Sequence, residues 1–347
     1  MVNPIINVIG VVAGVIGIWG FSEDHIPKKA EPKKPDDPNK YITTVRVTAG
    51  LDGADSLMSP GGRPHRLMGA GGRVDSMLHW NLKGDFLGNG HSVDRVGDGA
   101  FSDYKSPSSD GSQPVSTEIR GSSDSICIAT LTATWPDDSK YGWTGDWASI
   151  CGLPFYYSGI IMPSGKSPWC MWLTTNSALP DGDPRKPPGA IKITWHDFLS
   201  KDGKVPSRED AEKLCGNSLK AYTFSEHAGD EISLPRPYEV MEWNGGRDFN
   251  KRGASSNMGR SDNRLVISSR SEHNATALCE KSHSYGPDFV SLEEGIYCNM
   301  ETRETLPLCS SSIMGDCFDV DTHSHVIGDG SHKPSIRPRN PTNVIRW

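Results

Sequence analysis

The sequence predicts a mainly β protein with a β-sandwich-like body, a small cysteine-rich α/β C-terminal part and one apolar α-helix at the N-terminus. Three observations predict this fold class. Short runs of β-branched and aromatic residues recur between turn-rich segments. The 347 residues include 37 glycines and 25 prolines, which favour short strands and many turns over a helical bundle. The first 22 residues carry no ionisable side chain.

Residues 1–21 are predicted to form the apolar helix. Asn3 is a favoured N-cap and Pro4 suits the first helical position. A large apolar side chain gains about 1.5–3 kcal/mol on full burial, so a bilayer, the protein's own core or further copies of the chain must cover this helix. A cleaved signal peptide fits poorly, because no Lys or Arg precedes the apolar run and no A-x-A-like site follows it. We therefore expect the segment to be retained.

The predicted helix has two different faces. Small residues spaced i, i+3, i+4, i+7 form one narrow stripe: Gly10, Ala13, Gly14 and Gly17. Large side chains lie on the opposite side: Ile5, Val8, Val12, Ile16 and Trp19. A small-residue stripe lets another backbone approach closely, as in GxxxG packing, so such helices can bundle around a ring or along a filament. The alternatives are an ordinary core or anchor helix, and a terminus that inserts into bilayers as a fusion peptide does.

The rest of the chain divides into four parts. Residues 22–40 contain four prolines, five acidic residues and five lysines, and are expected to be an extended spacer. Residues 41–200 are predicted to form the sandwich-like domain, residues 201–325 a disulfide-rich α+β part and residues 326–347 an extended tail.

Several elements can be placed within these parts. Strands are expected at 41–48, 126–135, 155–162, 169–174 and 190–195, whereas 50–74 and 84–125 are rich in Gly, Ser and Asp and are expected to be loops. Ser207 followed by Asp210 predicts a capped helix. A strand–helix unit is expected from 265–267 to 275–279, and 343–347 could pair as an edge strand.

Eight cysteines without a CxxC pair indicate disulfides rather than a zinc site, and hence an oxidising compartment. They are Cys127, Cys151, Cys170, Cys215, Cys279, Cys298, Cys309 and Cys317. Proximity in the sequence favours Cys151–Cys170, Cys279–Cys298 and Cys309–Cys317, which leaves Cys127–Cys215. The sequon at Asn274 fits glycosylation of an exported chain.

Two blocks of the body resemble a known family. The first contains Trp143-Thr144-Gly145-Asp146-Trp147, Cys151-Gly152, Phe155-Tyr156-Tyr157-Ser158 and Cys170-Met171-Trp172. The second contains Leu265-Val266-Ile267-Ser268-Ser269, Leu278-Cys279-Glu280, Gly286-Pro287-Asp288-Phe289-Val290-Ser291, Glu294-Gly295 and Pro307-Leu308-Cys309-Ser310. Together with the uncharged N-terminus, they resemble a family of uncharacterised ascomycete fungal proteins. The resemblance implies a fungal source and an exported or surface protein, and it supplies no catalytic residues.

Candidate chemical sites are few. Asp319, Asp321, His323 and His325 alternate, so in a strand they would share one face, where they could hold a metal. Solvated side chains on a polar tail are the simpler interpretation, and no metal or cofactor is expected. The run 159–167 nearly matches a P-loop but is one residue too long, so a Gly-Lys turn between strands is favoured.

Histidines and aromatic residues offer two weaker candidates. His196, Asp197 and His283 could form a triad only if the fold brought them together, and no catalytic motif supports an enzyme. Exposed aromatic residues could stack on sugars, but in strands flanked by cysteines they are expected to form core. They are Trp135, Trp143, Trp147, Tyr156, Tyr157, Trp169 and Trp172.

The sequence therefore favours an extracellular or cell-surface structural protein that self-assembles through residues 1–21 into a filament or large oligomer. The alternative is a membrane-anchored or membrane-inserting surface protein whose β domain binds a ligand such as a glycan. The net charge of -7 argues against a nucleic-acid partner.

Overall fold

The computed structural model describes residues 41–51, 69–92, 94–108, 111–162, 165–177, 179, 183, 185–198, 207–222, 264–310, 315–328, 335–341 and 343–347. The predicted N-terminal helix, with Ile5, Gly10, Val12, Ala13, Gly14, Ile16, Gly17 and Trp19, lies outside the described residues, as does the spacer at 22–40. Among the helices that the structure describes, none has the length and apolar character needed to cross a bilayer.

Two antiparallel sheets form the body. The first has the order β4-β1-β6-β9-β8, with β7 also paired to β6. Its strands are β1 Tyr41–Ala49, β4 Phe101–Ser108, β6 Ile126–Thr134, β7 Lys140–Thr144, β8 Phe155–Tyr157 and β9 Trp169–Leu173. The second has the order β11-β10-β5-β2-β3. Its strands are β2 Val74–Trp80, β3 Phe86–His91, β5 Ser116–Gly121, β10 Ala190–Thr194 and β11 Leu219–Tyr222.

The two sheets pack face to face as a sandwich. Alternate side chains of β1, such as Val45 and Val47, share one core with Ile119 of β5 and Ile191 of β10. The sheets approach each other closely where β3 crosses β4. A Cβ on Gly88 would lie 2.5 Å from the Pro107 carbonyl oxygen, a backbone atom of β4, so this crossing requires glycine.

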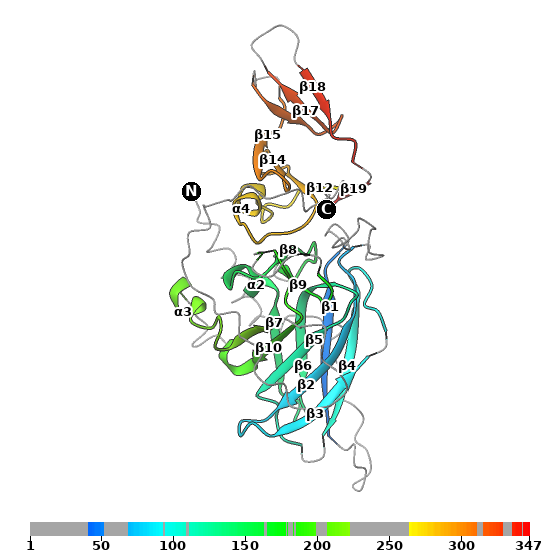
Figure 1. The fold of residues 1–347 in the computed structure, drawn as a ribbon, viewed down its shortest axis with the longest axis vertical. Helices are drawn as coiled ribbons and strands as arrows, with labels where there is room; N and C mark the ends of the chain where they lie inside the picture. The colour runs from blue at the N-terminus through cyan, green and yellow to red at the C-terminus, as the bar shows by residue number, and fades with distance from the viewer. Residues whose placement is uncertain are drawn as a thin grey trace.

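A second unit follows the sandwich in the chain. Strand β12 (Arg264–Ser268), helix α4 (Ala275–Glu280) and parallel strand β13 (Asp288–Ser291) form a β–α–β crossover. Its sheet has the order β15-β14-β13-β12-β19, with β14 Ile296–Asn299, β15 Glu304–Pro307 and β19 Asn343–Arg346. A three-stranded sheet comprises β16 Cys317–Asp319, β17 Ser324–Ile327 and β18 Ser335–Pro338. Figure 1 shows the sandwich, this unit and the three-stranded sheet following one another along the long axis.

Short helices connect the strands of the sandwich. Helix α2 (Asp146–Ile150) follows β7, η3 (Trp195–Phe198) follows β10, and α3 (Arg208–Glu212) precedes β11. The Ser207 hydroxyl caps α3 by accepting the Asp210 N–H, as predicted. The predicted strand–helix unit and the edge strand at the C-terminus are also confirmed, because β19 pairs in parallel with β12.

Two predictions about the body were wrong. Residues 84–125 are not a loop, because they contain β3, β4 and β5. Strand β4 is polar yet pairs with β1 from Phe101 to Ser108, and its Pro107 is tolerated because β4 is an edge strand. The sandwich also extends beyond residue 200, since β11 pairs with β10 and completes the second sheet.

All eight cysteines form disulfides. Cys279–Cys298 and Cys309–Cys317 are confirmed. The other two predicted pairs were wrong, since the bonds are Cys127–Cys170 and Cys151–Cys215. Proximity in the sequence failed here because β6 and β9 are adjacent strands, which places Cys127 beside Cys170.

The Cys151–Cys215 bond is expected to stabilise the sandwich most, because it closes the longest loop, with a sequence separation of 64. The paired substitution Cys151→Ser with Cys215→Ser should lower the free energy of unfolding by about 4 kcal/mol in urea denaturation. The matched pair Cys309→Ser with Cys317→Ser, with a separation of 8, should cost less. Equal losses would contradict the loop argument, and non-reducing peptide mapping checks the connectivity directly.

Candidate functional site

A serine, a lysine and a histidine that could act in chemistry lie close together where the sandwich contacts the C-terminal unit. We define the joint as strand β8 together with residues 281–287. Its backbone groups pair directly: the Tyr285 N–H donates to the Phe155 carbonyl at 2.9 Å and the Phe155 N–H to the His283 carbonyl at 3.4 Å. Phe155 and Ser284 form a parallel bridge. The C-terminal unit therefore continues the edge of the first sheet.

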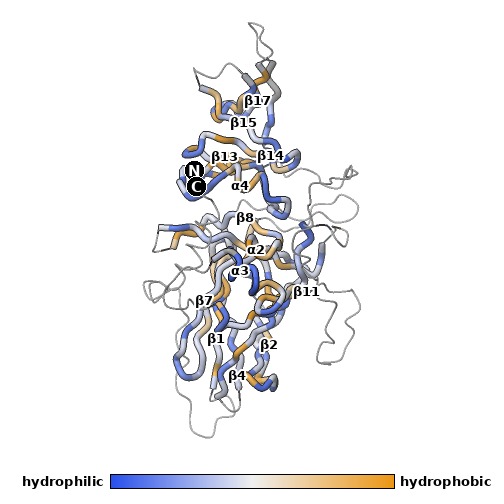
Figure 2. The backbone as a smooth tube through the Cα atoms, turned by 90° about the vertical axis from the view of Figure 1, so that its left-hand side faces the viewer, coloured by the Kyte–Doolittle hydropathy of each residue, from blue (hydrophilic) through white to orange (hydrophobic). Residues whose placement is uncertain are grey.

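Aromatic side chains carry the core across the joint. Tyr156 donates its hydroxyl to the Pro287 carbonyl at 3.0 Å, and Tyr157 donates to the Asn274 carbonyl at 2.6 Å. The Trp172 indole N–H donates to the Tyr285 carbonyl at 3.2 Å. Hydrophobic stretches gather around α2 and β8 in Figure 2. One buried core thus includes residues of both units, such as Phe155 and Phe289.

Close approach at the joint depends on Gly286. A Cβ at this position would lie 2.2 Å from the Tyr156 ring. The Tyr156 ring is itself fully buried, so it has no free space to move into. Glycine is therefore required at this position by packing.

A serine, a lysine and a histidine lie together beside the joint. The Lys281 ammonium donates to the Ser149 hydroxyl at 2.5 Å and lies 4.5 Å from the centre of the Trp169 ring. His283 Nε2 lies 3.3 Å from the Ser149 carbonyl oxygen, to which it can donate. Ser149 comes from α2, which begins at the end of β7, whereas Lys281 and His283 follow α4. The tertiary fold alone brings them together.

Burial sets the charge states in this cluster. Asp146, on the same helix as Ser149, is fully buried, which raises the pKa of its carboxyl to about 7. Burial, reinforced by the charge of Lys281, lowers the pKa of His283 to about 4. Both groups are thus shifted toward their neutral forms, while Lys281 provides the charge at this position.

The geometry of Ser149 and Lys281 fits a structural link between the two units better than a nucleophile and its base. A serine next to a lysine can act as a nucleophile and its base, but only if the lysine is neutral and the serine is accessible. Here the Trp169 ring face favours the charged ammonium, and Ser149 is only 6% exposed. Lys281 links α2 and β9 to the end of α4.

A second polar network crosses the sandwich core. His79 Nδ1 lies 2.8 Å from the Thr117 hydroxyl, and Nε2 lies 2.8 Å from the Ser106 hydroxyl on the opposite sheet. The Trp195 indole N–H donates to the same Thr117 oxygen at 2.8 Å. The hydroxyls of Thr117 and Ser106 can each donate or accept, so the hydrogen bonds at both ring nitrogens are satisfied in either neutral tautomer. Burial lowers the pKa of His79 to about 3.

The sequence candidates fall in separate places. Asp319 ends β16 and His325 lies in β17, while Asp321 and His323 lie in the turn between these strands, so the four do not share one strand face. Within the residues that the structure covers, no three His, Cys, Asp or Glu residues are grouped as metal ligands. The Gly-Lys run is a turn between β8 and β9, in which the Gly165 N–H donates to the Met162 carbonyl.

The proposed triad is not assembled by these contacts. His196 contacts Tyr141 at the far side of the sandwich, Asp197 accepts from Ser218, and His283 lies at the joint. The core prediction for the seven aromatic residues is confirmed, since every one of them is at most 7% exposed. Sugar stacking on these rings is therefore excluded.

Asn274 is the N-cap of α4. Its side-chain oxygen accepts the Ala277 N–H at 2.5 Å. Its side-chain nitrogen is not used in this cap, so the fold is compatible with a glycan there. Glycosylation of Asn274 stays a prediction.

Comparison with protein-family models and with curated proteins finds no match to the chain. The fold defines its class: a mainly β, disulfide-bonded protein with two units joined by one core. Four disulfides are typical of extracellular proteins. The fungal resemblance stays a prediction.

Lys281 at the joint and the buried His79 were not among the sequence candidates, because neither belongs to a local motif. Lys281 follows a helix and Ser149 lies 132 residues earlier in the chain. His79 was easier to predict from the sequence than Lys281, since its neighbours at 77 and 78 are apolar and it lies in a strand. A histidine inside such a run predicts a buried, hydrogen-bonded imidazole.

The substitution Gly286→Ala should weaken the joint, because its methyl group would overlap the Tyr156 ring. We expect a loss of about 1–3 kcal/mol in the free energy of unfolding, measured in urea. The control is Gly315→Ala, since nothing lies within 4 Å of a Cβ at that position. Equal stability of the two variants would show that the joint does not restrict residue 286.

Acid should destabilise the folded chain through three histidines. Burial lowers the pKa values of His79, His273 and His283 to about 3, 3 and 4, from 6.5 when unfolded. Below pH 6.5 the unfolded state binds more protons than the folded state, so the free energy of unfolding decreases as the pH is lowered. Asp146 opposes this between pH 3.8 and about 7, because its folded carboxyl keeps a proton. These four groups alone are expected to give a net slope of about 2.5 kcal/mol per pH unit near pH 5, and the raised pKa values of Asp124 and Asp288 reduce it further.

Denaturation at a series of pH values checks this slope. The substitution His273→Gln should lower the slope by the contribution of one proton, roughly 1 kcal/mol per pH unit. His91→Gln, at an exposed position in β3, is the control and should leave the slope unchanged. A profile that is flat between pH 7 and 5 would be incompatible with neutral buried imidazoles.

Proposed function

We propose that this protein is an extracellular or cell-surface structural protein, in which residues 1–21 are buried in an apolar environment and a rigid body stands clear of it. The observation that carries the proposal is the joint. One core and a direct backbone pairing unite the sandwich with the C-terminal unit, and four disulfides stabilise them. Such a body resists deformation, which suits a scaffold or a surface layer.

Self-assembly is the first candidate for the environment of residues 1–21. The stripe formed by Gly10, Ala13, Gly14 and Gly17 supports it, because small residues on one face let helices pack closely. In this arrangement the apolar helices bundle and the bodies decorate the outside of a filament or large oligomer.

A bilayer is the second candidate. The run from Pro4 to Phe21 would be about 27 Å long as a helix, which nearly matches a hydrocarbon core of about 30 Å. The spacer at 22–40 would then hold the body away from the membrane. A ligand for the body, such as a glycan, would have to bind somewhere other than the seven buried aromatic residues.

One substitution distinguishes the two candidates. Gly14→Leu keeps the segment apolar but fills the small-residue stripe, so it should reduce the size of a helix-bundled particle and leave membrane association intact. Val12→Leu, on the opposite face, is the matched control. Particle size is measured by electron microscopy and light scattering of the purified full chain, and membrane association by resistance to carbonate extraction.

The outcomes separate clearly. Large particles lost with Gly14→Leu support self-assembly. Carbonate-resistant membrane association that is lost on deleting residues 1–21 supports the anchor. Detergent-free, monodisperse monomers that retain residues 1–21 would overturn both candidates.

A further inference from the structure

The turn between β2 and β3 presents apolar side chains to solvent. We define the tip as residues 80–86. Leu82 is 85% exposed and Phe86 is 49% exposed. The other exposed large hydrophobic residues of the described chain lie outside this turn: Phe101, Ile161 and Leu292. Phe101 is moreover stacked against the Arg46 guanidinium at 3.9 Å.

The tip is held rigidly in this shape. The Asn81 side-chain oxygen accepts the N–H groups of Lys83 and Asp85 at 2.9 Å each, and its amide donates to the Asp85 carboxylate at 3.0 Å. The Asn81 N–H also donates to the Asp85 carbonyl at 3.0 Å. Leu82 therefore stays at the apex without further ordering of the turn on contact, which lowers the entropic cost of binding.

The base of the tip combines aromatic rings and a cation. The rings of Trp80 and Phe86 lie 6.1 Å apart in an edge-to-face arrangement, and the Lys192 ammonium lies 4.2 Å from the Trp80 ring centre. Lys83 is exposed beside Leu82. Apolar and aromatic side chains flanked by lysines match the boundary between lipid headgroups and acyl chains.

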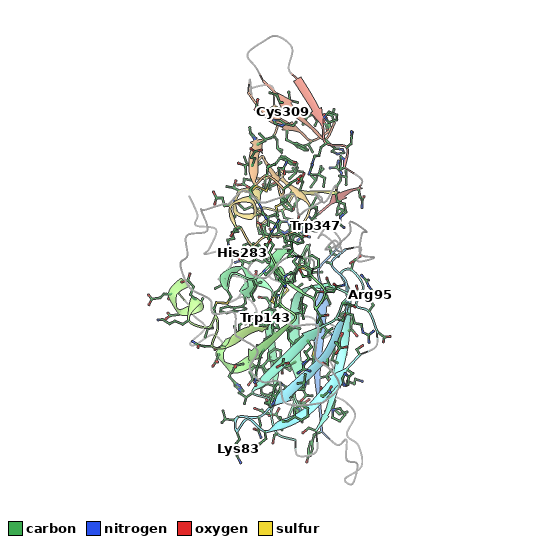
Figure 3. All side chains as sticks on the ribbon, viewed as in Figure 1. Lys83, Arg95, Trp143, His283, Cys309 and Trp347 are labelled. Atoms are coloured by element: carbon green, nitrogen blue, oxygen red, sulfur yellow. A yellow bond between two sulfur atoms is a disulfide. The ribbon has the colours of Figure 1, made fainter. Side chains whose placement is uncertain are left out.

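The position of the tip relates it to the N-terminal segment. Figure 3 places Lys83 at the end of the molecule opposite to Cys309. Strand β1 begins at Tyr41, which pairs with Ser108, and Trp80 pairs with Ser116 only eight residues further along the chain. The chain thus enters the sandwich at the end that carries the tip. A Pro-rich spacer of 19 residues, at about 3.1 Å per residue, lets residues 1–21 reach the surface that the tip faces.

We propose that the tip is a second contact with a lipid surface, in addition to residues 1–21; this inference rests on the membrane-anchored form of the proposed function. A lipid surface receives Leu82 and Phe86 without a complementary pocket. A second copy of the described body, packed tip against tip, is the alternative that the test below distinguishes.

The test places an environment-sensitive dye at the tip of the full chain. Lys83→Cys carries the dye, and the chain is reconstituted with phosphatidylcholine vesicles. We expect a blue shift in emission with vesicles. Asp321→Cys, exposed in the turn between β16 and β17, is the matched label and should show no shift. Adding Leu82→Asn and Phe86→Asn to the Lys83→Cys chain should abolish the shift, whereas adding Ile161→Asn should not.

Each result decides the inference. A vesicle-bound chain whose Lys83 label does not shift overturns the tip contact but leaves the anchor standing. A chain that does not bind vesicles at all overturns both. A blue shift in concentrated protein without lipid assigns the tip to a contact between copies and overturns the lipid surface.

Discussion

The structure depends on one constraint: strand β8 must be completed by the chain that follows α4. An edge strand leaves its outer N–H and C=O groups unpaired, and such an edge invites non-specific pairing. Here Phe155 pairs with residues 283–285 of the C-terminal unit. Tyr156 and Tyr157 then reach across, and their hydroxyls satisfy carbonyls on that unit. The same contact closes the sheet and fixes the second unit on the first.

Two buried polar residues of this body, His79 and Asp288, are accommodated in different ways. His79 links the two sheets with hydrogen bonds at both ring nitrogens, and burial lowers its pKa, which favours the neutral ring. Asp288 takes the other solution. Its carboxylate accepts from Tyr297, Arg339 and the Met300 N–H, all in the C-terminal unit. These three donors favour the charged carboxylate, although burial outweighs them and raises the pKa of Asp288.

Much of the fold could be predicted from local patterns. The strand expected at 126–135, the Ser207 cap and the apolar β12 followed by α4 have local signals, and the structure confirms all three. Strand β4 could not be found this way, because its sequence FSDYKSPS is polar and its pairing with β1 is long-range. The predicted pairing of the four sandwich cysteines was wrong for the same reason, because both bonds join residues that are distant in the sequence. Likewise Lys281 and Ser149 carry no local sign of their contact.

The joint and the tip differ in how far their apolar side chains are buried. At the joint, large rings are buried to near completion, and even a methyl group on Gly286 would not fit. At the tip, a turn pinned by Asn81 holds Leu82 out in solvent. The same chain buries seven aromatic side chains of the sandwich to an exposure of at most 7%. A single exposed leucine is ordinary, so the proposed lipid contact rests on Leu82 and Phe86 together and on the rigid turn that holds them.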